Sequence, residues 1–193
     1  MNELVPQSIE ELFRAVGDQL ASAGATATIV VVGGASLLLH GWVERVTRDV
    51  DIIALARKQG EEYTLTPPDP LPPALTDAIS RVARDFSLPR DWMNTVIGAQ
   101  WMSGLPEGID HDLTWRRYSA LEVGIAGRRT LIALKLYACV DQGPESVHCQ
   151  DLLALQPTDN ELLETARWVM SQDESPAFPG MISEVIDYVR KHR

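Results

Sequence analysis

The chain has 193 residues, a formal net charge of −10, a hydrophobic share of 45% and two cysteines. This size fits one domain, or one domain with a helical extension, and the acidic balance argues against broad, non-specific nucleic-acid binding, which needs many phosphate contacts from Lys and Arg. No signal-peptide pattern, no apolar run long enough to span a bilayer and no cysteine framework is present, so we expect a cytoplasmic protein without a membrane segment.

Hydrophobic spacing predicts most elements of the first part of the chain. In order, it predicts a helix over residues 8–23, a strand over 26–32, a short helix over 35–40, a strand over 49–55 and a helix over 74–87. Five prolines predict a loop over residues 63–73, because proline denies both a backbone donor and helical continuity. Residues 88–117 show no clear pattern.

The second part of the chain is mostly helical in pattern. A strand is expected over residues 118–125, followed by helices over 129–141, 146–156, a segment starting at Thr158, and 180–191. The sequence therefore predicts an α/β (α+β) core over residues 1–127 and a helical C-terminal part over residues 128–193.

Two acids in the segment VVGGASLLLHGWVERVTRDVDIIAL carry the first functional argument. Strand alternation places Asp49 and Asp51 on one face, with Val50 and Ile52 on the other. Neighbouring carboxylates repel each other, and a shared Mg²⁺ removes that conflict. An Asp-x-Asp pair alone is common on exposed strands. Its combination with an apolar strand and the Gly33-Gly34 turn, whose backbone can approach phosphate, indicates a site for metal and nucleotide.

This segment resembles the signature of the nucleotidyltransferase superfamily of polymerase-β-like minimal fold. The resemblance rests on Gly33-Gly34 and Asp49-Val50-Asp51, although the spacing is a few residues longer than usual and a glycine replaces the usual serine. It implies a mixed sheet flanked by helices, Mg²⁺ or Mn²⁺ held by Asp49 and Asp51, and an NTP bound by the glycine turn.

The run Arg45-x-Thr47-x-Asp49-x-Asp51 is similar to the AbiEii-like toxin branch of type IV toxin–antitoxin systems. In that branch the Ser or Thr two residues before the first Asp belongs to the site, so the resemblance places Thr47 and Arg48 in the nucleotide-binding set. The alternative for Thr47 is an ordinary β-branched strand residue.

Lys135, in the helical stretch LIALKLYA, has two interpretations. Periodicity alone favours a side chain that snorkels to the surface, whereas a lysine held inward would bind an anion. The AbiEii-like branch resembles the second arrangement, with a lysine on such a helix contacting nucleotide phosphates and a following Asp near the site. Asp151 is that Asp here, and Gln150 departs from the basic residue that usually precedes it.

Several features stay open at this level. A third acid near the metal is Glu122, Asp112 or absent. Glu122 also fits a strand residue whose side chain points outward. Five basic residues between positions 116 and 135 form either a basic patch or a solvated surface: Arg116, Arg117, Arg128, Arg129 and Lys135. Cys139 is expected to be a core thiol.

The resemblance implies an enzyme that moves an NMP from an NTP to an acceptor hydroxyl. As a toxin-like protein, it would act on tRNA and pair with a cognate antitoxin. A small molecule or a protein hydroxyl is the alternative acceptor, and a catalytically degenerate fold used as a binding module is the alternative function. The NTP and the oligomeric state are not determined by the sequence.

Overall fold

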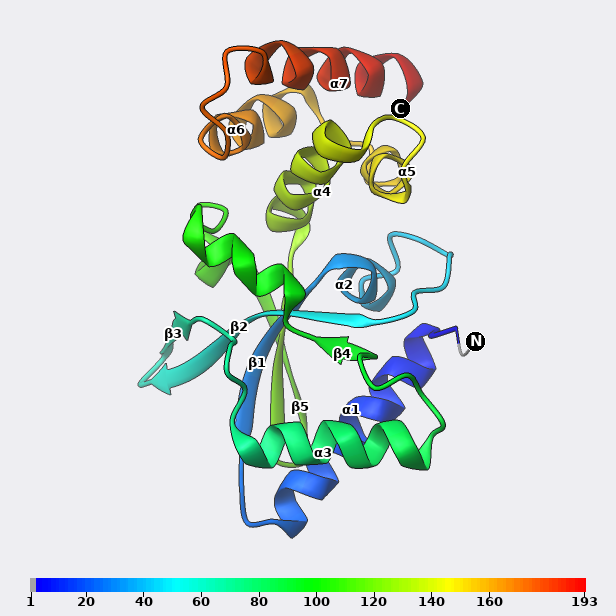
Figure 1. The fold of residues 1–193 in the computed structure, drawn as a ribbon, viewed down its shortest axis with the longest axis vertical. Coiled ribbons are helices and arrows are strands. Elements are labelled where there is room, and N and C mark those ends of the chain that lie inside the picture. The colour runs from blue at the N-terminus through cyan, green and yellow to red at the C-terminus, as the bar shows by residue number, and fades with distance from the viewer. Residues whose placement is uncertain (1–2) are drawn as a thin grey trace. The chain divides into compact units, whose positions relative to one another are not determined.

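The computed structural model describes residues 3–193 and confirms the predicted fold class (Figure 1). A six-stranded mixed sheet is flanked by helices, and the C-terminal part is helical. The elements are α1 (Pro6–Ser22), β1 (Ala27–Val32), α2 (Gly33–Leu39), β2 (Val50–Gln59), β3 (Glu62–Thr66), α3 (Pro73–Asp85), β4 (Met93–Asn94), the 3₁₀ helices η1 (Val96–Met102) and η2 (Ile109–His111), β5 (Leu113–Tyr118), β6 (Leu121–Ala126), α4 (Arg128–Gln142), α5 (Val147–Ala154), α6 (Asp159–Met170) and α7 (Phe178–His192).

The chain divides into two compact units. The first contains residues up to Trp101 together with Leu113–Ala126, and the second contains Met102–Asp112 and Gly127–Arg193. The first unit thus holds the sheet with α1, α2 and α3, and the second holds α4 to α7. The short segment 102–112 groups with the helices although it precedes the last two strands.

The sheet of the first unit has the strand order β3-β2-β1-β6-β5, and β4 pairs with the start of β2. β1 runs parallel to β6 and antiparallel to β2. Apolar side chains run almost continuously along the central strands. One face of the sheet packs against α1 and α3, and Ile29, Val31, Val50, Ile52, Leu121 and Val123 belong to that core. The residues between them point to the opposite face.

Several predicted boundaries differ from the structure, three of them in the sheet. β3 occupies Glu62–Thr66, at the start of the segment predicted to be a loop, because pairing with β2 satisfies its backbone before the prolines begin. Ser119, at φ +55°, turns the chain between β5 and β6, so the predicted strand over residues 118–125 is Leu121–Ala126. β2 begins at Val50 rather than Asp49 and continues to Gln59.

In the second unit, α4 is buried on nearly all sides. Residues 130–136 are buried without interruption, and α4 contacts α5, α6 and α7. A helix that is buried all round has no wet face for a long polar side chain to reach. Among residues 3–193, no helix combines the length and the hydropathy that a membrane-spanning segment needs.

Candidate nucleotide and metal site

The turn between β1 and α2 packs directly against Asp51. Gly33 has φ +71°, in the left-handed region that favours glycine. A β-carbon added to Gly33 would lie 2.5 Å from Oδ2 of Asp51, closer than real β-carbons approach another heavy atom. Glycine is therefore needed twice at this position, for its backbone conformation and for the space that the carboxylate fills.

Gly34 is enclosed by residues of the segment before β2. A β-carbon on Gly34 would lie 2.7 Å from Oγ1 of Thr47 and 3.2 Å from Nη2 of Arg45. Thr47 is only 6% exposed, and its backbone exchanges two hydrogen bonds with Leu4, at 2.8 and 3.1 Å. The structure thus brings Thr47 to the glycine turn, whereas the next residue, Arg48, is exposed.

The two predicted metal ligands lie at the start of β2. Val50 and Ile52 are fully buried in the core. Asp51 is half-buried, its side chain lies on the other face of the sheet, and it pairs with Val32 of β1. Asp49 is half-buried and directly precedes the first strand residue. An extended chain places residues two apart on one side, so the arrangement is compatible with a shared cation.

A β-bulge follows Asp51 closely. The register between β1 and β2 shifts at Val30 and Val31, which leaves Ile53 without a partner on β1. The indole Nε1 of Trp101 donates a hydrogen bond of 2.7 Å to the Ile53 carbonyl. Bulges bend a strand and increase its local twist, so this one changes the direction of β2 two residues beyond the carboxylate.

Asn94 is a neighbour of Asp51 that the sequence analysis did not find. β4 pairs in parallel with β2, so that Asn94 lies opposite Asp51, and Nδ2 of Asn94 is 3.5 Å from Oδ1 of Asp51. The backbone N–H of Val96 donates to Oδ1 of Asn94 at 3.0 Å and fixes that oxygen. β4 has two residues, too few for a periodic pattern, so no sequence signal could have identified it.

The two candidates for a third acid belong to different units, and Glu122 does not lie beside Asp51. Glu122 is level with Thr28 on β1, four residues from Val32, which corresponds to about 13 Å along the strand. Asp112 belongs to the helical unit, where its Oδ2 accepts a hydrogen bond of 2.7 Å from the backbone N–H of Thr130 at the start of α4. Within residues 3–193, no cluster of three or more His, Cys, Asp or Glu residues is arranged to hold a metal ion.

Lys135 and Asp151 form an ion pair within the helical unit. The distance from Nζ of Lys135 to Oδ2 of Asp151 is 2.8 Å, and the two side chains are 6% and 1% exposed. Nδ1 of His148 lies 3.2 Å from the same Nζ. The snorkelling interpretation of Lys135 is therefore wrong, because the surroundings of α4 leave its ammonium group no route to the surface. The lysine is held inward by two side chains of α5.

A family model matches residues 8–94, and its description reads "Nucleotidyltransferase of unknown function (DUF6036)". This match supports the nucleotidyltransferase superfamily. It covers Gly33, Gly34, Asp49 and Asp51 and ends at Asn94, so it does not reach Lys135 or Asp151 and does not test the AbiEii-like branch. No curated protein and no solved structure matches the chain.

Outside this nucleotidyltransferase match, three of the five basic residues between positions 116 and 135 are neutralised by acids. Arg116 pairs with Glu10 at 2.7 Å and Arg128 pairs with Glu161 at 2.6 Å, in addition to the Lys135 pair. The cluster also divides between the two units after residue 126. The five residues therefore do not form the single basic patch that was one of the two interpretations of the sequence.

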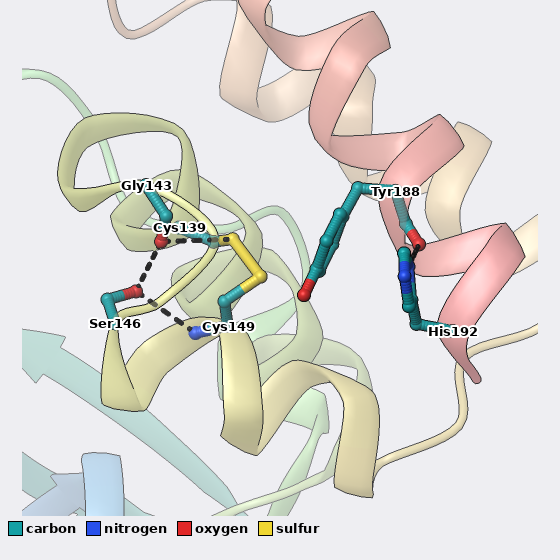
Figure 2. The surroundings of a disulfide bond; sticks show 6 residues. All are labelled: Cys139, Gly143, Ser146, Cys149, Tyr188 and His192. Carbon is teal, nitrogen blue, oxygen red and sulfur yellow. Dashed lines mark hydrogen bonds between the residues drawn. A yellow bond between two sulfur atoms is a disulfide. The ribbon is translucent and has the colours of Figure 1, made fainter.

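Cys139 and Cys149 are joined by a disulfide, so the prediction of a core thiol at Cys139 is wrong (Figure 2). The bond links α4 to α5, both cysteines are fully buried, and their Cα atoms are 4.9 Å apart. Ser146 caps α5 by accepting a hydrogen bond from the backbone N–H of Cys149 at 3.2 Å, and Tyr188 of α7 lies beside the bond. The disulfide connects the same two helices as the Lys135–Asp151 pair.

Proposed function

We propose that the chain is a magnesium-dependent nucleotidyltransferase that moves an NMP from an NTP to an acceptor hydroxyl. The observation that carries this proposal is the close packing of Gly33 on the Asp51 carboxylate. A glycine turn and an acid at the start of the neighbouring strand lie next to each other, which supports the expectation from the resemblance. The family match over residues 8–94 supports the same reaction class.

The residues present fit a divalent cation. Carboxylate oxygens are the ligands that Mg²⁺ and Mn²⁺ prefer, and Mg²⁺ is commonly held by one or two carboxylates together with substrate phosphates. Asp49 and Asp51 would supply the carboxylates, and the missing side chain at Gly33 leaves room for the Asp51 carboxylate. When bound, the cation would neutralise charge on the triphosphate and lower the pKa of the acceptor hydroxyl.

The residues of this chain would act mainly by positioning. The acceptor hydroxyl releases its proton to solvent and its oxygen attacks the α-phosphorus. A new O–P bond forms, the bond between the α-phosphorus and the bridging oxygen breaks, and pyrophosphate leaves. Gly33 and Gly34 would contact the phosphates through their backbone N–H groups, with Thr47 and Arg48 nearby in the chain. On the resemblance, Lys135 is the proposed phosphate-binding cation of the helical unit and Asp151 holds it in place.

For the acceptor we propose tRNA, as the resemblance to the AbiEii-like branch implies, in a cytoplasmic toxin that pairs with an antitoxin. The net charge of −10 and the ion-paired arginines limit the surface available to a polyanion, so a small-molecule or protein hydroxyl is the second choice. The bond that forms at phosphorus is the same in each case.

The test uses the full chain with each of four NTPs labelled at the α-phosphate, Mg²⁺, and either total tRNA or a cell lysate. We expect a labelled product that EDTA abolishes and that Asp51→Asn reduces by roughly a hundredfold or more. Asp77→Asn is the matched control, because Asp77 is an exposed acid of the same unit on α3. If no NTP gives a product and none raises the melting temperature, the chain is a degenerate fold that serves as a binding module.

A further inference from the structure

The glycine turn has a positively charged neighbour that neither the signature nor the family match assigns. Nη2 of Arg45 reaches within 3.2 Å of the position that a β-carbon of Gly34 would occupy, and Nη1 donates a hydrogen bond of 3.0 Å to the Val46 carbonyl. Arg45 is half-buried. The turn therefore lies between an acid on its Gly33 side and a guanidinium on its Gly34 side.

The backbone around Thr47 holds Arg45 in this position. The bridge between Leu4 and Thr47 fixes the chain two residues beyond Arg45. The side chains of Arg45 and Thr47 both lie close to the position that a β-carbon of Gly34 would occupy. The neighbouring Arg48, by contrast, is exposed. Of the two arginines in this segment, Arg45 is the one whose guanidinium contacts the turn.

The chemistry of the proposed substrate requires charges of both signs at this place. A magnesium triphosphate presents a divalent cation, which needs carboxylates, and phosphate oxygens that keep negative charge after the metal is bound. Guanidinium is planar, always charged, and donates two parallel hydrogen bonds to phosphate oxygens. An acid beside Gly33 and an arginine beside Gly34 match that distribution.

We propose that Arg45 binds the polyphosphate of the NTP beside Gly34. This assignment rests on the proposed function and adds a residue to it. Arg45 contacts substrate and not the metal, so its loss weakens nucleotide binding while divalent-ion binding at Asp49 and Asp51 persists.

Magnesium tripolyphosphate is the probe, because it contains the phosphate chain without a base. Calorimetric titration of the full chain gives the affinity of each variant. We expect Arg45→Ala to weaken binding by about tenfold or more, Arg45→Lys by about threefold, and Arg45→Met, which keeps the apolar stem, as much as the alanine variant. Arg57→Ala, at an exposed arginine of β2 six residues beyond Asp51, stays within about twofold of the unaltered chain.

A second measurement separates substrate binding from a structural role. Mn²⁺ binding, followed by electron paramagnetic resonance, is expected to be lost in Asp51→Asn and kept in Arg45→Ala. If Arg45→Met binds tripolyphosphate as well as the unaltered chain, Arg45 only packs on the turn and the assignment is wrong, while the proposed function stands on its own labelling test. If the unaltered chain neither transfers label nor binds tripolyphosphate, both are overturned.

Discussion

Gly33 and Asp51 approach each other so closely that a single methyl group on the glycine would collide with the carboxylate, at 2.5 Å from Oδ2. The two residues come from the turn after β1 and the start of β2, eighteen positions apart in the sequence. The space beside the carboxylate is thus kept by an absent side chain. A substitution can remove that space without changing any charged residue.

Replacing Gly33 with alanine should separate the site from the stability of the fold. Gly33→Ala and Gly41→Ala both force alanine to a φ near +70°, at a cost of about 1–2 kcal/mol each, but nothing lies within 4 Å of a β-carbon at Gly41. We therefore expect Gly33→Ala to lose at least as much unfolding free energy in urea as Gly41→Ala, and Mn²⁺ binding to be lost only in Gly33→Ala. Equal Mn²⁺ binding by the two variants would refute the role of the glycine.

The ion pair of Lys135 and Asp151 can be removed in one step or two. Lys135→Met leaves the Asp151 carboxylate buried and unbalanced, which should cost about 3–5 kcal/mol of unfolding free energy. The double variant Lys135→Met/Asp151→Leu should regain most of that stability, because no buried charge remains. Urea unfolding measures both changes. If the stable double variant still transfers label at the normal rate, Lys135 has no role in binding phosphate.

Asn94 provides a test of the charge beside Asp51. Asn94→Asp replaces the amide group next to Oδ1 of Asp51 with a third carboxylate. Like charges at that separation repel each other. We expect a lower melting temperature in EDTA and a larger rise with Mg²⁺ than the unaltered chain shows. Asn94→Ala, which adds no charge, should lack the enhanced response. The absence of a metal-dependent gain in Asn94→Asp would place the cation elsewhere.

Glu161 should make the stability of the helical unit depend on pH. Hydrogen bonds from the Arg128 guanidinium are the main reason why the pKa of Glu161 falls from its ordinary value of 4.5 to about 2. Because the folded pKa is lowered, the stabilisation is complete above pH 4.5 and is lost as the pH falls toward about 2. Glu161→Gln should reduce the change of unfolding free energy over this pH range by on the order of 1 kcal/mol, since the pair is partly exposed.

The control for Glu161 is Glu164→Gln, at an exposed acid on the same helix that makes no ion pair with any residue between 3 and 193. Acid-induced unfolding followed by circular dichroism should show the unaltered pH dependence for this variant. An unchanged slope in Glu161→Gln would mean that Arg128 does not hold the carboxylate in solution.

The link between Cys139 and Cys149 predicts a response to reductant. Opening a disulfide whose cysteines are ten residues apart should lower the unfolding free energy by about 2–3 kcal/mol. Dithiothreitol is therefore expected to lower the melting temperature of the unaltered chain and to leave Cys139→Ser/Cys149→Ser unaffected. Alkylation of two thiols in protein that was unfolded without reductant would show that the bond is absent in solution.

The proximity of the glycine turn to Asp51 could be predicted from the sequence because its signals are local. An apolar strand, two glycines and two acids separated by one apolar residue define their own geometry through backbone alternation. The identification of β4 and of Asn94 failed because two residues carry no period. The prediction for residues 63–66 failed because the prolines that follow them dominated the pattern, although pairing with β2 decides their conformation.

The side-chain arrangement of the helical unit depended on contacts between distant residues. Periodicity placed Lys135 on a helix but favoured the wrong direction, because a helix that is packed on all sides gives no polar face to recognise. Cys139 looked like an ordinary core residue, since nothing in the linear chain shows that α5 brings Cys149 beside it.

By itself, the sequence determined which residue types stand at the end of the first strand and at the start of the second, because steric and hydrogen-bonding rules act over a few neighbouring positions. Only the tertiary structure decided that Asp51 fills the space beside Gly33, that Thr47 and Arg45 enclose Gly34, and that Lys135 turns inward to Asp151. These relationships arise from the pairing of strands and the packing of helices, which join residues far apart along the chain.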